Sequence, residues 1–277
     1  MYARPPRRET RMKVYIFTDM EGVGGVVEWE QAMPQRPGYE EARELLAGEM
    51  NSAVRGAFEG GADEVIVRDG HYMGRNFIME KLEPRAKYYV GRAPALTRMP
   101  GIEGSDVMFC IGYHARANTP SGILCHTMDG TNVASFRVNG REYGELGMDA
   151  LWAGLHGVGV GMVSGDDALA REAKELFGDV EAAVVKQGST RFGGFVIPPS
   201  EARAMIHRSA AAATRKAAEK KPAPLSIKPP YCIELDVVGQ EILEKKLTLV
   251  PGARRKGAST LAVEGEDLNY LMFAVLV

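Results

Sequence analysis

Near its N-terminus the chain reads Val14-Tyr15-Ile16-Phe17-Thr18-Asp19-Met20-Glu21-Gly22. The first five residues are β-branched or aromatic, which predicts a β-strand. Apolar side chains fall on both of its faces, as in a strand of a parallel sheet that helices cover on both sides. Asp19 and Glu21 follow directly. They are two residues apart on an extended chain, so we expect both side chains to leave the same face.

Four later segments resemble this strand, and helical patterns lie between them. The further strand candidates are Glu64–Arg68, Val107–Gly112, Val158–Val163 and Ala182–Lys186. The helix candidates are Tyr39–Phe58, which ends at Gly60-Gly61, and Asp166–Phe177, which ends at Gly178; glycine is a common helix stop. Alternation of strands and helices predicts an α/β fold with a largely parallel sheet covered by helices.

The second half of the chain adds a hairpin and a separate group of elements. Asn139-Gly140, between the segments Val133–Val138 and Arg141–Tyr143, is typical of a two-residue hairpin turn, and Glu145 follows at an expected helix start. An alanine-rich helix is expected over 198–220. The later patterns predict a smaller α+β unit, with segments Ser226–Val238, Gln240–Lys246, Thr260–Val263 and Asp267–Val277. We therefore expect three parts: an N-terminal arm at 1–11, an α/β metal-binding catalytic domain at 12–198 and an α+β domain at 199–277.

Composition excludes several classes of protein. The 277 residues are 45% hydrophobic and 25% charged, so a sizeable core can form. The net charge of −2 favours neither nucleic acid nor an anionic membrane as partner. The three cysteines form no CxxC pair, which indicates a reducing compartment. No apolar run has membrane-spanning length.

The polar N-terminal segment Met1–Arg11 has no apolar region typical of a secretory signal. Either it is a flexible arm or translation starts at Met12, and the sequence leaves both open. We therefore expect a cytoplasmic protein.

Acidic and imidazole side chains follow several of the expected strands. Asp19, Glu21, His71 and His114 lie at or just past strand ends, where open parallel sheets bind their ligands. Each has a plainer interpretation alone: a solvated turn for the two acids, a loop imidazole for His71, a core histidine for His114 and a helix-dipole contact for Glu145. Together they form a ligand set suited to zinc and related metals, and this convergence favours a metal site.

Charge balance favours two metal ions over one. The three carboxylates of Asp19, Glu21 and Glu145 bring three negative charges, and two divalent ions with one bridging hydroxide neutralise them. Such ions typically lie about 3.5–4 Å apart, whereas one zinc needs only three of these side chains. We expect Asp19 to bridge the two ions and the site to hydrolyse its substrate with metal-activated water. Zinc is the expected metal, and manganese or cobalt also suits such ligands.

The remaining histidines and motifs are less informative. His126, twelve residues after His114, fits either a proton-transfer group near the metals or a structural histidine on a short strand, and spacing does not separate the two. We expect no chemistry from His156 and His207. The glycines after Glu21 match neither of the common phosphate-loop patterns, and no GxSxG motif is present.

Taken in order, these motifs resemble one known family: the chain is similar to the DppA-type D-aminopeptidases of peptidase family M55. The resemblance covers nearly the whole chain apart from the N-terminal arm. The matching stretches are Thr18-Asp19-Met20-Glu21-Gly22-Val23, Asp69-Gly70-His71, Gly112-Tyr113-His114-Ala115-Arg116-Ala117, Cys125-His126-Thr127-Met128, Gly144-Glu145-Leu146-Gly147, Gly165-Asp166-Asp167, Val185-Lys186-Gln187 and Val250-Pro251-Gly252.

The resemblance implies a binuclear zinc aminopeptidase with an α/β core. It places the family's metal ligands on Asp19, Glu21, His71, His114 and Glu145, with the first aspartate bridging. It also implies short peptide substrates with an N-terminal D-residue, notably D-alanine. The assembly it implies is a homodecamer of two stacked pentameric rings whose active sites face an inner chamber.

Further residues follow from the same resemblance. The family's catalytic histidine falls on His126. Lys186 and Gln187 are candidates for lining the substrate pocket, and a structural pair at a strand end is the alternative.

The chain also departs from the family pattern. The segment from His114 to His126 is one residue longer, Cys125 replaces a small polar residue, and 188–190 differ. Substrate preference is the property these changes affect. The alternatives are therefore an aminopeptidase of the same family acting on L-peptides, or another binuclear hydrolase such as an amidohydrolase or phosphoesterase. A non-enzymatic peptide-binding protein is a further alternative. The cluster of candidate metal ligands argues against it, because a protein that only binds peptides does not need such a cluster.

Overall fold

A computed structural model describes residues 11–276, so the expected arm falls outside the described residues except for Arg11. The larger sheet has strand order β3-β2-β1-β4-β7-β8-β9. All neighbours are parallel except β9, which runs antiparallel to β8. The five expected strands are confirmed as β1 (Lys13–Thr18), β2 (Glu64–Asp69), β4 (Val107–Tyr113), β7 (Val160–Asp166) and β8 (Glu181–Thr190).

The sequence did not predict several short elements at the edges and in the loops. They are β3 (Lys87–Tyr89), β9 (Gly193–Val196), α1 (Trp29–Ala32) and the 3₁₀ turn η1 (Met79–Lys81). Such short segments carry too few residues to show a hydrophobic period.

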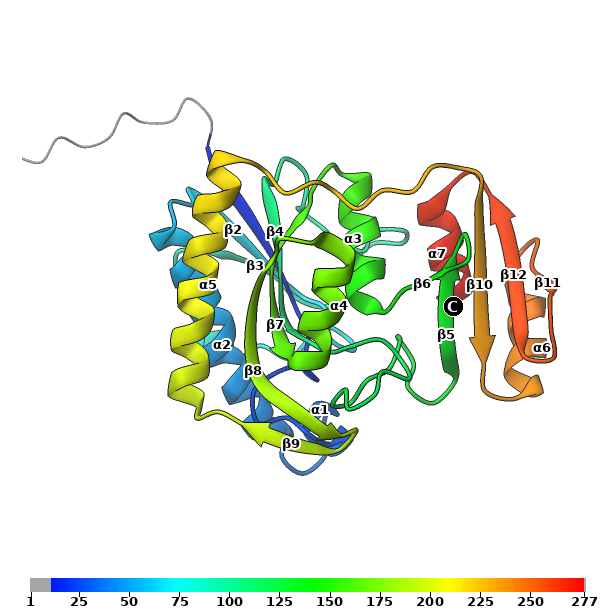
Figure 1. Ribbon diagram of the computed structural model, residues 1–277, viewed down its shortest axis with the longest axis horizontal. Helices are drawn as coiled ribbons and strands as arrows, with labels where there is room; N and C mark the ends of the chain where they lie inside the picture. Colours follow the sequence, from blue (N-terminus) through cyan, green and yellow to red (C-terminus); the bar gives the residue numbers. More distant parts are fainter. Residues whose placement is uncertain (1–10, 277) are drawn as a thin grey trace, which may run out of the picture.

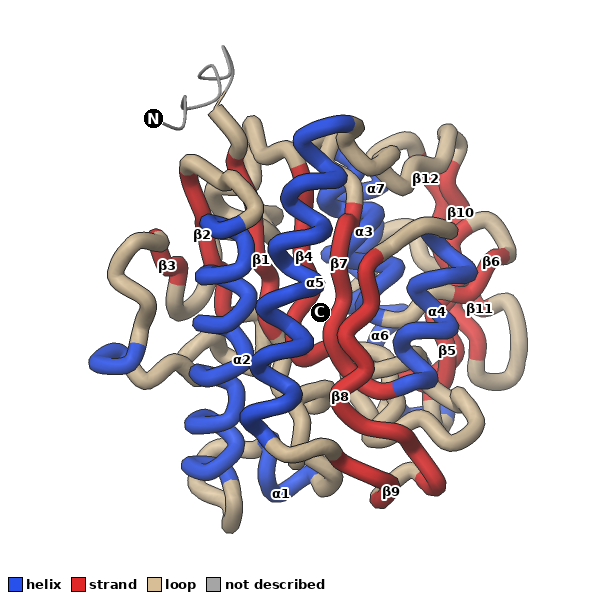
Figure 2. The backbone as a smooth tube through the Cα atoms, turned by 60° about the vertical axis from the view of Figure 1, so that its left-hand side comes forward, coloured by secondary structure: helices blue, strands red, loops and turns tan. Residues whose placement is uncertain are grey.

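Helices cover both faces of the larger sheet. On one face α2 (Tyr39–Glu59) and α5 (Pro199–Glu219) run side by side (Figures 1 and 2). On the other face lie α3 (Glu145–Leu155) and α4 (Asp167–Phe177). Alternate residues of β1 serve the two cores: Val14 and Ile16 pack with α2 and α5, while Tyr15 and Phe17 belong to the opposite core. The predicted α/β class with a helix-covered, largely parallel sheet is confirmed.

A second, smaller sheet is antiparallel and has strand order β11-β12-β10-β5-β6. Its strands are β5 (Val133–Val138), β6 (Arg141–Glu142), β10 (Tyr231–Val237), β11 (Arg254–Arg255) and β12 (Thr260–Gly265). Helices α6 (Gln240–Leu249) and α7 (Leu268–Leu276) belong to the same unit. Figure 1 shows α3 and α7 between the two sheets, and the rings of Trp152 and Phe273 join them at 5.2 Å.

The two units exchange elements along the chain. The β5–β6 hairpin was placed in the larger domain by the sequence, and it pairs with β10 of the smaller sheet. Helix α5, expected to open the smaller domain, packs on α2 and β8. A domain boundary at residue 198 stays a prediction, and this packing favours a later boundary, in the segment 221–230.

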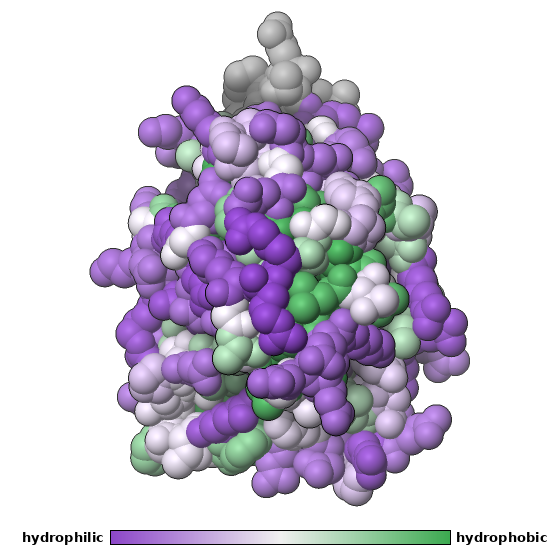
Figure 3. Space-filling model, turned by 90° about the vertical axis from the view of Figure 1, so that its right-hand side faces the viewer, coloured by the Kyte–Doolittle hydropathy of each residue, from purple (hydrophilic) through white to green (hydrophobic). Residues whose placement is uncertain are grey.

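The surface is largely polar. Among residues 11–276, no helix combines the length and the apolar character needed to cross a lipid bilayer. On the side formed by the smaller unit, hydrophilic side chains surround an apolar area (Figure 3). The large apolar side chains that this unit exposes include Val238, Leu249 and Tyr270.

Candidate metal centre

The site forms where the chain order of the sheet reverses. From β1 the chain moves to β2 on one side and later to β4 on the other, so β1 lies between them. Thr18 aligns with Asp69 of β2 and with Ile111 of β4, so the three strands end nearly level. Crevices outside such strand ends are where open α/β sheets bind ligands.

The first group of side chains consists of Asp19, Glu21 and His71. All three are nearly buried. His71 Nδ1 lies 3.0 Å from Asp19 Oδ1 and 3.1 Å from Glu21 Oε2. One ligand atom from each residue falls within 4.8 Å of the others, a spacing that can hold one metal ion.

The second group consists of His114, His126 and Glu145, and it satisfies the same criterion. Glu145 Oε1 lies 3.3 Å from Nε2 of His114 and 3.3 Å from Nε2 of His126. The two imidazole rings are stacked with centroids 3.9 Å apart. Glu145 is the first residue of α3, where the helix dipole favours a negative charge.

Asp19 faces both groups. Its Oδ1 lies 3.0 Å from His71 Nδ1, and its Oδ2 lies 3.4 Å from His114 Nε2. A carboxylate whose two oxygens point to different ligand groups has the arrangement of a bridge between two cations.

Backbone carbonyls orient each imidazole. His71 Nε2 lies 2.7 Å from the carbonyl oxygen of Ala32, His114 Nδ1 3.0 Å from that of Ala115, and His126 Nδ1 2.8 Å from that of Leu124. A carbonyl only accepts, so the nitrogen that faces it donates. The other nitrogen of each ring then faces the carboxylates, where it would offer its lone pair to a metal ion, which is how metal-binding histidines are usually held.

The donor set fits a divalent metal. Within the described residues, Glu21 Oε2 and His114 Nε2 are buried, and their short contacts to His71, Asp19 and Glu145 lack hydrogen-bond geometry. Buried polar atoms are normally paired, so two unpaired atoms in a cluster of carboxylates and imidazoles indicate cation binding. Oxygen and nitrogen donors of this kind suit zinc.

Electrostatics at the site favour charged side chains despite burial. Burial opposes ionisation of Asp19, but hydrogen bonds from His114 and His71 outweigh it and hold the pKa well below its usual value. Burial likewise opposes the charged form of Glu145, yet attraction to His114 lowers its pKa to about 2. For His71 and His114, attraction to the carboxylates overcomes burial and raises each pKa well above the ordinary value. Without a metal, the imidazoles of His71 and His114 carry protons that face the ionised carboxylates. A metal cation would take the place of these protons, so metal binding would release them.

Two glycines allow the turn after β1 to approach the end of β4. A Cβ on Gly22 would lie 1.7 Å from the carbonyl oxygen of Tyr113, and Gly22 donates its N–H to Gly112 at 2.7 Å. Gly112 has a φ of +74°, in the region that favours glycine. This contact brings the acids after β1 next to the histidine after β4.

Lys186 holds the same turn from behind. Its buried Nζ donates to the carbonyl oxygens of Glu21, Val23 and Val26 at 2.6, 3.1 and 2.6 Å. Burial lowers the pKa of Lys186 to about 8. On the same turn Gly24 donates its N–H to Glu49 at 2.8 Å, and burial raises the pKa of Glu49 to about 7.

His126 sits on a strained loop. Within 114–128, Leu124 and Met128 have positive φ angles of 51° and 62°, a conformation that non-glycine residues rarely adopt. Leu124 is fully buried and donates its N–H to Arg191 at 2.8 Å, which fixes this conformation. The Trp29 ring meets the His126 ring edge-on at 5.0 Å.

A cavity of about 610 Å³ opens over the two groups. Its wall includes side chains that the sequence did not single out: Trp29, Arg98, Asp129 and Arg191. They come from loops and a single-turn helix, where no periodicity marks them. Of these four, Trp29 alone could have been noticed in the sequence, because the chain has two tryptophans.

The structure thus brings together six residues predicted for the site: Asp19, Glu21, His71, His114, His126 and Glu145. Lys186 and Gln187 are not among the described residues that line this cavity, and Gln187 is exposed on β8. A substrate-binding role for them stays a prediction that this placement does not favour. His156 and His207 lie at the end of α3 and within α5, as expected.

Comparison with known proteins gives consistent matches. The model of peptidase family M55, described as D-aminopeptidase, matches residues 12–277. A D-aminopeptidase of Bacillus subtilis (strain 168) is 34% identical over 269 residues, which span 96% of each chain. A solved structure, the Zn-dependent D-aminopeptidase DppA from Bacillus subtilis, described as a self-compartmentalizing protease, superposes with a TM-score of 0.89. It is 31% identical, with 96% of each chain covered.

Proposed function

Since the chain belongs to peptidase family M55, the D-aminopeptidases, we propose that it removes the N-terminal residue from short peptides, with D-residues such as D-alanine preferred. The observation that carries the proposal is the pair of ligand groups that share Asp19. Relatives whose names state zinc dependence and D-aminopeptidase activity support it.

The proposed metal ligands are Asp19, Glu21, His71, His114 and Glu145, and the proposed cofactor is two zinc ions per subunit. When bound, such ions activate water at neutral pH and polarise the scissile carbonyl. Manganese or cobalt would suit the same donors.

His126 is the proposed proton-transfer residue. Its Nδ1 donates a hydrogen bond to the Leu124 carbonyl oxygen, so Nε2 is the nitrogen that can exchange a proton with a substrate in the cavity. The stacked His114 ring and the edge of Trp29 fix its orientation. From this position it would protonate the departing amine or stabilise the tetrahedral oxyanion.

Recognition of a free amino terminus would distinguish an aminopeptidase from other hydrolases. Among the described residues lining the cavity, Asp129 is the carboxylate outside the two ligand groups. The Asn132 side chain donates to it at 2.8 Å, and the backbone N–H groups of Thr131 and Asn132 donate at 2.9 and 3.1 Å. Against partial burial, these hydrogen bonds lower the pKa of Asp129. It is therefore a fixed anion at the cavity wall that can receive a substrate ammonium group.

The proposed assembly is a homo-oligomer, a decamer of two pentameric rings, in the cytoplasm. The solved relative is described as self-compartmentalizing, which supports enclosure of the active sites. Partners other than short peptides, such as nucleic acid or membrane, are not part of the proposal.

Chelated protein assayed on D-Ala-D-Ala, L-Ala-L-Ala and an aryl phosphate, as zinc, manganese or cobalt is returned, tests the function. We expect metal-dependent cleavage of the D-dipeptide. Preference for the L-dipeptide would place the chain in the same family with another specificity, and cleavage of the phosphate alone would overturn the peptidase assignment. Cobalt or manganese outperforming zinc would change the proposed native metal.

A further inference from the structure

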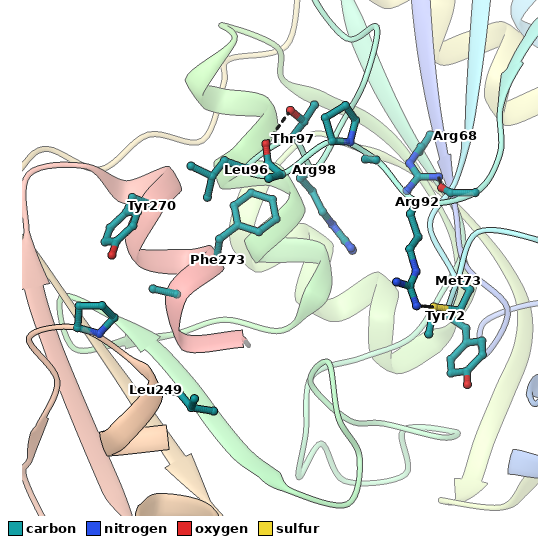
Figure 4. Close-up of a pocket in the computed structure, with 16 residues that line it drawn as sticks. Arg68, Tyr72, Met73, Arg92, Leu96, Thr97, Arg98, Leu249, Tyr270 and Phe273 are labelled. Carbon is teal, nitrogen blue, oxygen red and sulfur yellow. Dashed lines mark hydrogen bonds between the residues drawn. The ribbon is translucent and has the colours of Figure 1, made fainter. Parts of the chain in front are cut away.

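A second cavity, of about 570 Å³, borders the one that contains the ligand groups. Tyr72 and Arg98 line both cavities, so these two side chains form a shared wall. The second cavity lies between the loop 91–98 of the larger unit and helix α7 of the smaller unit (Figure 4). No step of the proposed reaction uses it.

The charge of this cavity is opposite to that of its neighbour. Three arginines line it, Arg68, Arg92 and Arg98, and no acidic side chain is among its described lining residues. The neighbouring cavity contains four carboxylates. We call the second one the arginine cavity. Its charge favours an anionic ligand.

Arg68 gives independent evidence for an anion. It is 7% exposed, and its Nη1 donates to the Gly91 carbonyl at 2.9 Å. Its Nε is buried without a hydrogen-bond partner within the described residues. That nitrogen is enclosed by protein, so Arg68 contributes charge to the cavity rather than this donor. The guanidinium lies over the Tyr89 ring at 5.0 Å and forms no ion pair with a described carboxylate, so its positive charge is available to an anion at the arginine cavity.

Arg98 is held at the junction of the cavities by Asp149, which balances its charge. Its Nε and Nη2 donate to the two oxygens of Asp149 at 2.7 and 3.1 Å. The guanidinium also lies over the Phe17 ring at 4.9 Å. Arg92 is exposed, and its polar contact is a weak one to the sulfur of Met73 at 3.4 Å. Figure 4 shows Arg92 and Arg98 extending from the same loop.

The rest of the wall is apolar. It includes Leu96, Leu249, Pro251, Tyr270 and Phe273, and Figure 4 shows Leu96 beside Phe273 of α7. Cations on one side and apolar side chains on the other fit a ligand with a carboxylate and an apolar body. The departing end of a peptide has this composition: a side chain and a terminal carboxylate.

We propose that the arginine cavity binds the C-terminal part of the peptide substrate, with the free α-carboxylate on the guanidinium groups and the side chain against the apolar wall. This inference rests on the proposed aminopeptidase function. A peptide whose first residue lies at the ligand groups advances roughly 3.5 Å per residue along the shared wall of Tyr72 and Arg98. The substrate class is therefore short peptides with a free carboxyl terminus.

A binding experiment tests the cavity without any hydrolysis. The probes are N-acetyl-D-phenylalanine and N-acetyl-D-phenylalaninamide, which differ in the carboxylate and lack the free amino group that an aminopeptidase needs. Calorimetry on the full-length metal-loaded protein should show at least about tenfold tighter binding of the acid, since a charge-assisted pair is lost in the amide. Arg92→Ala should abolish the difference. Arg208→Ala, which removes an exposed arginine on α5, should preserve it.

Steady-state kinetics then tests whether the carboxylate recognised by the arginine cavity is that of the peptide substrate. We expect kcat/KM for D-Ala-D-Phe to exceed that for its C-terminal amide about tenfold, and Arg92→Ala to remove this preference mainly through KM. Equal binding of the two probes, or an unchanged preference in Arg92→Ala, overturns the proposal. Selective binding of the acid with equal cleavage of acid and amide also overturns it, because the cavity then holds a separate anion. If neither dipeptide is cleaved, the aminopeptidase function fails, while the binding result still decides whether the cavity recognises carboxylates.

Discussion

Gly22→Ala tests whether the close approach of two strand ends builds the metal centre. The new Cβ would lie 1.7 Å from the Tyr113 carbonyl oxygen and 2.5 Å from the Gly112 carbonyl carbon. These are backbone atoms, so no side chain can rotate away. Ordinary contact requires separations of about 3.5 Å, so the turn after β1 must move by well over 1 Å.

The displacement is large compared with what a metal site tolerates. Ligand distances in working sites stay within about 0.2 Å of their ideal values. Asp19 and Glu21 flank the moving backbone, and the 2.7 Å hydrogen bond from Gly22 to Gly112 is strained or lost. We expect zinc affinity to fall at least tenfold. Mutating residues that orient the metal ligands typically lowers metal affinity by roughly 10–100-fold. Overpacking should cost about 2 kcal/mol, or roughly 4–8 °C in Tm.

The assay is zinc titration against a competing chelator, with Tm measured on the same samples. Gly265→Ala is the matched control, because its new Cβ would meet Leu271 at 3.5 Å, an ordinary contact. The control should keep wild-type affinity and Tm. Wild-type zinc affinity in Gly22→Ala, with correct folding shown by circular dichroism, would mean that the contact between Gly22 and the end of β4 does not position the metal ligands.

Further outcomes follow from the other contacts of the site and of the smaller sheet. His126→Ala should lower kcat by about 10²–10⁴-fold while zinc content stays at the wild-type value; loss of zinc would make His126 a ligand instead. Lys186→Met removes the three hydrogen bonds that this buried ammonium group, whose pKa burial lowers to about 8, donates to the turn after β1. We expect the free energy of unfolding, measured by denaturant titration, to fall by about 2–4 kcal/mol. An unchanged unfolding midpoint would show that Lys186 does not stabilise this turn. Hydrogen bonds from Arg137 hold the pKa of Asp236 well below its usual value, so its stabilisation is complete above about pH 4 and disappears as the pH falls through the lower folded-state pKa. Asp236→Asn should therefore lower Tm at pH 7, and the gap from wild type should narrow below pH 4; a constant gap would contradict this. Chelation should abolish activity reversibly, with recovery on adding zinc, and full activity in the chelated protein would exclude a metal mechanism.

Sequence alone predicted the elements whose signal is local. The run before Asp19 is apolar on both faces because both faces of β1 are covered, and this marked the central strand. The metal-ligand candidates could be found because they follow strand ends, and the parallel sheet brings those ends to one edge. Glu145 was recognisable from its place at a helix start.

Pairings between distant segments were not predictable from local pattern. The β5 strand could be anticipated from the Asn139-Gly140 turn that follows it, but its own residues do not indicate that it pairs with β10. Ser135 donates a hydrogen bond to Asp236, which lies 101 residues away in the sequence. The domain expectation for β5 therefore rested on chain order alone. Lys186 is a similar case, because a lysine after an apolar strand does not show that three carbonyls of a remote turn surround it. Arg98 and Trp29 belong to irregular segments whose positions depend on tertiary packing.

An anomalous-scattering map, recorded at the zinc edge on crystals of the full-length protein, would show whether Asp19 joins two zinc ions. We expect two peaks per chain. One should lie about 2.0–2.2 Å from ligand atoms of Asp19, Glu21 and His71, and the other should lie at the same distance from Asp19, His114 and Glu145. A single peak, or peaks that leave the two oxygens of Asp19 on the same ion, would contradict this expectation.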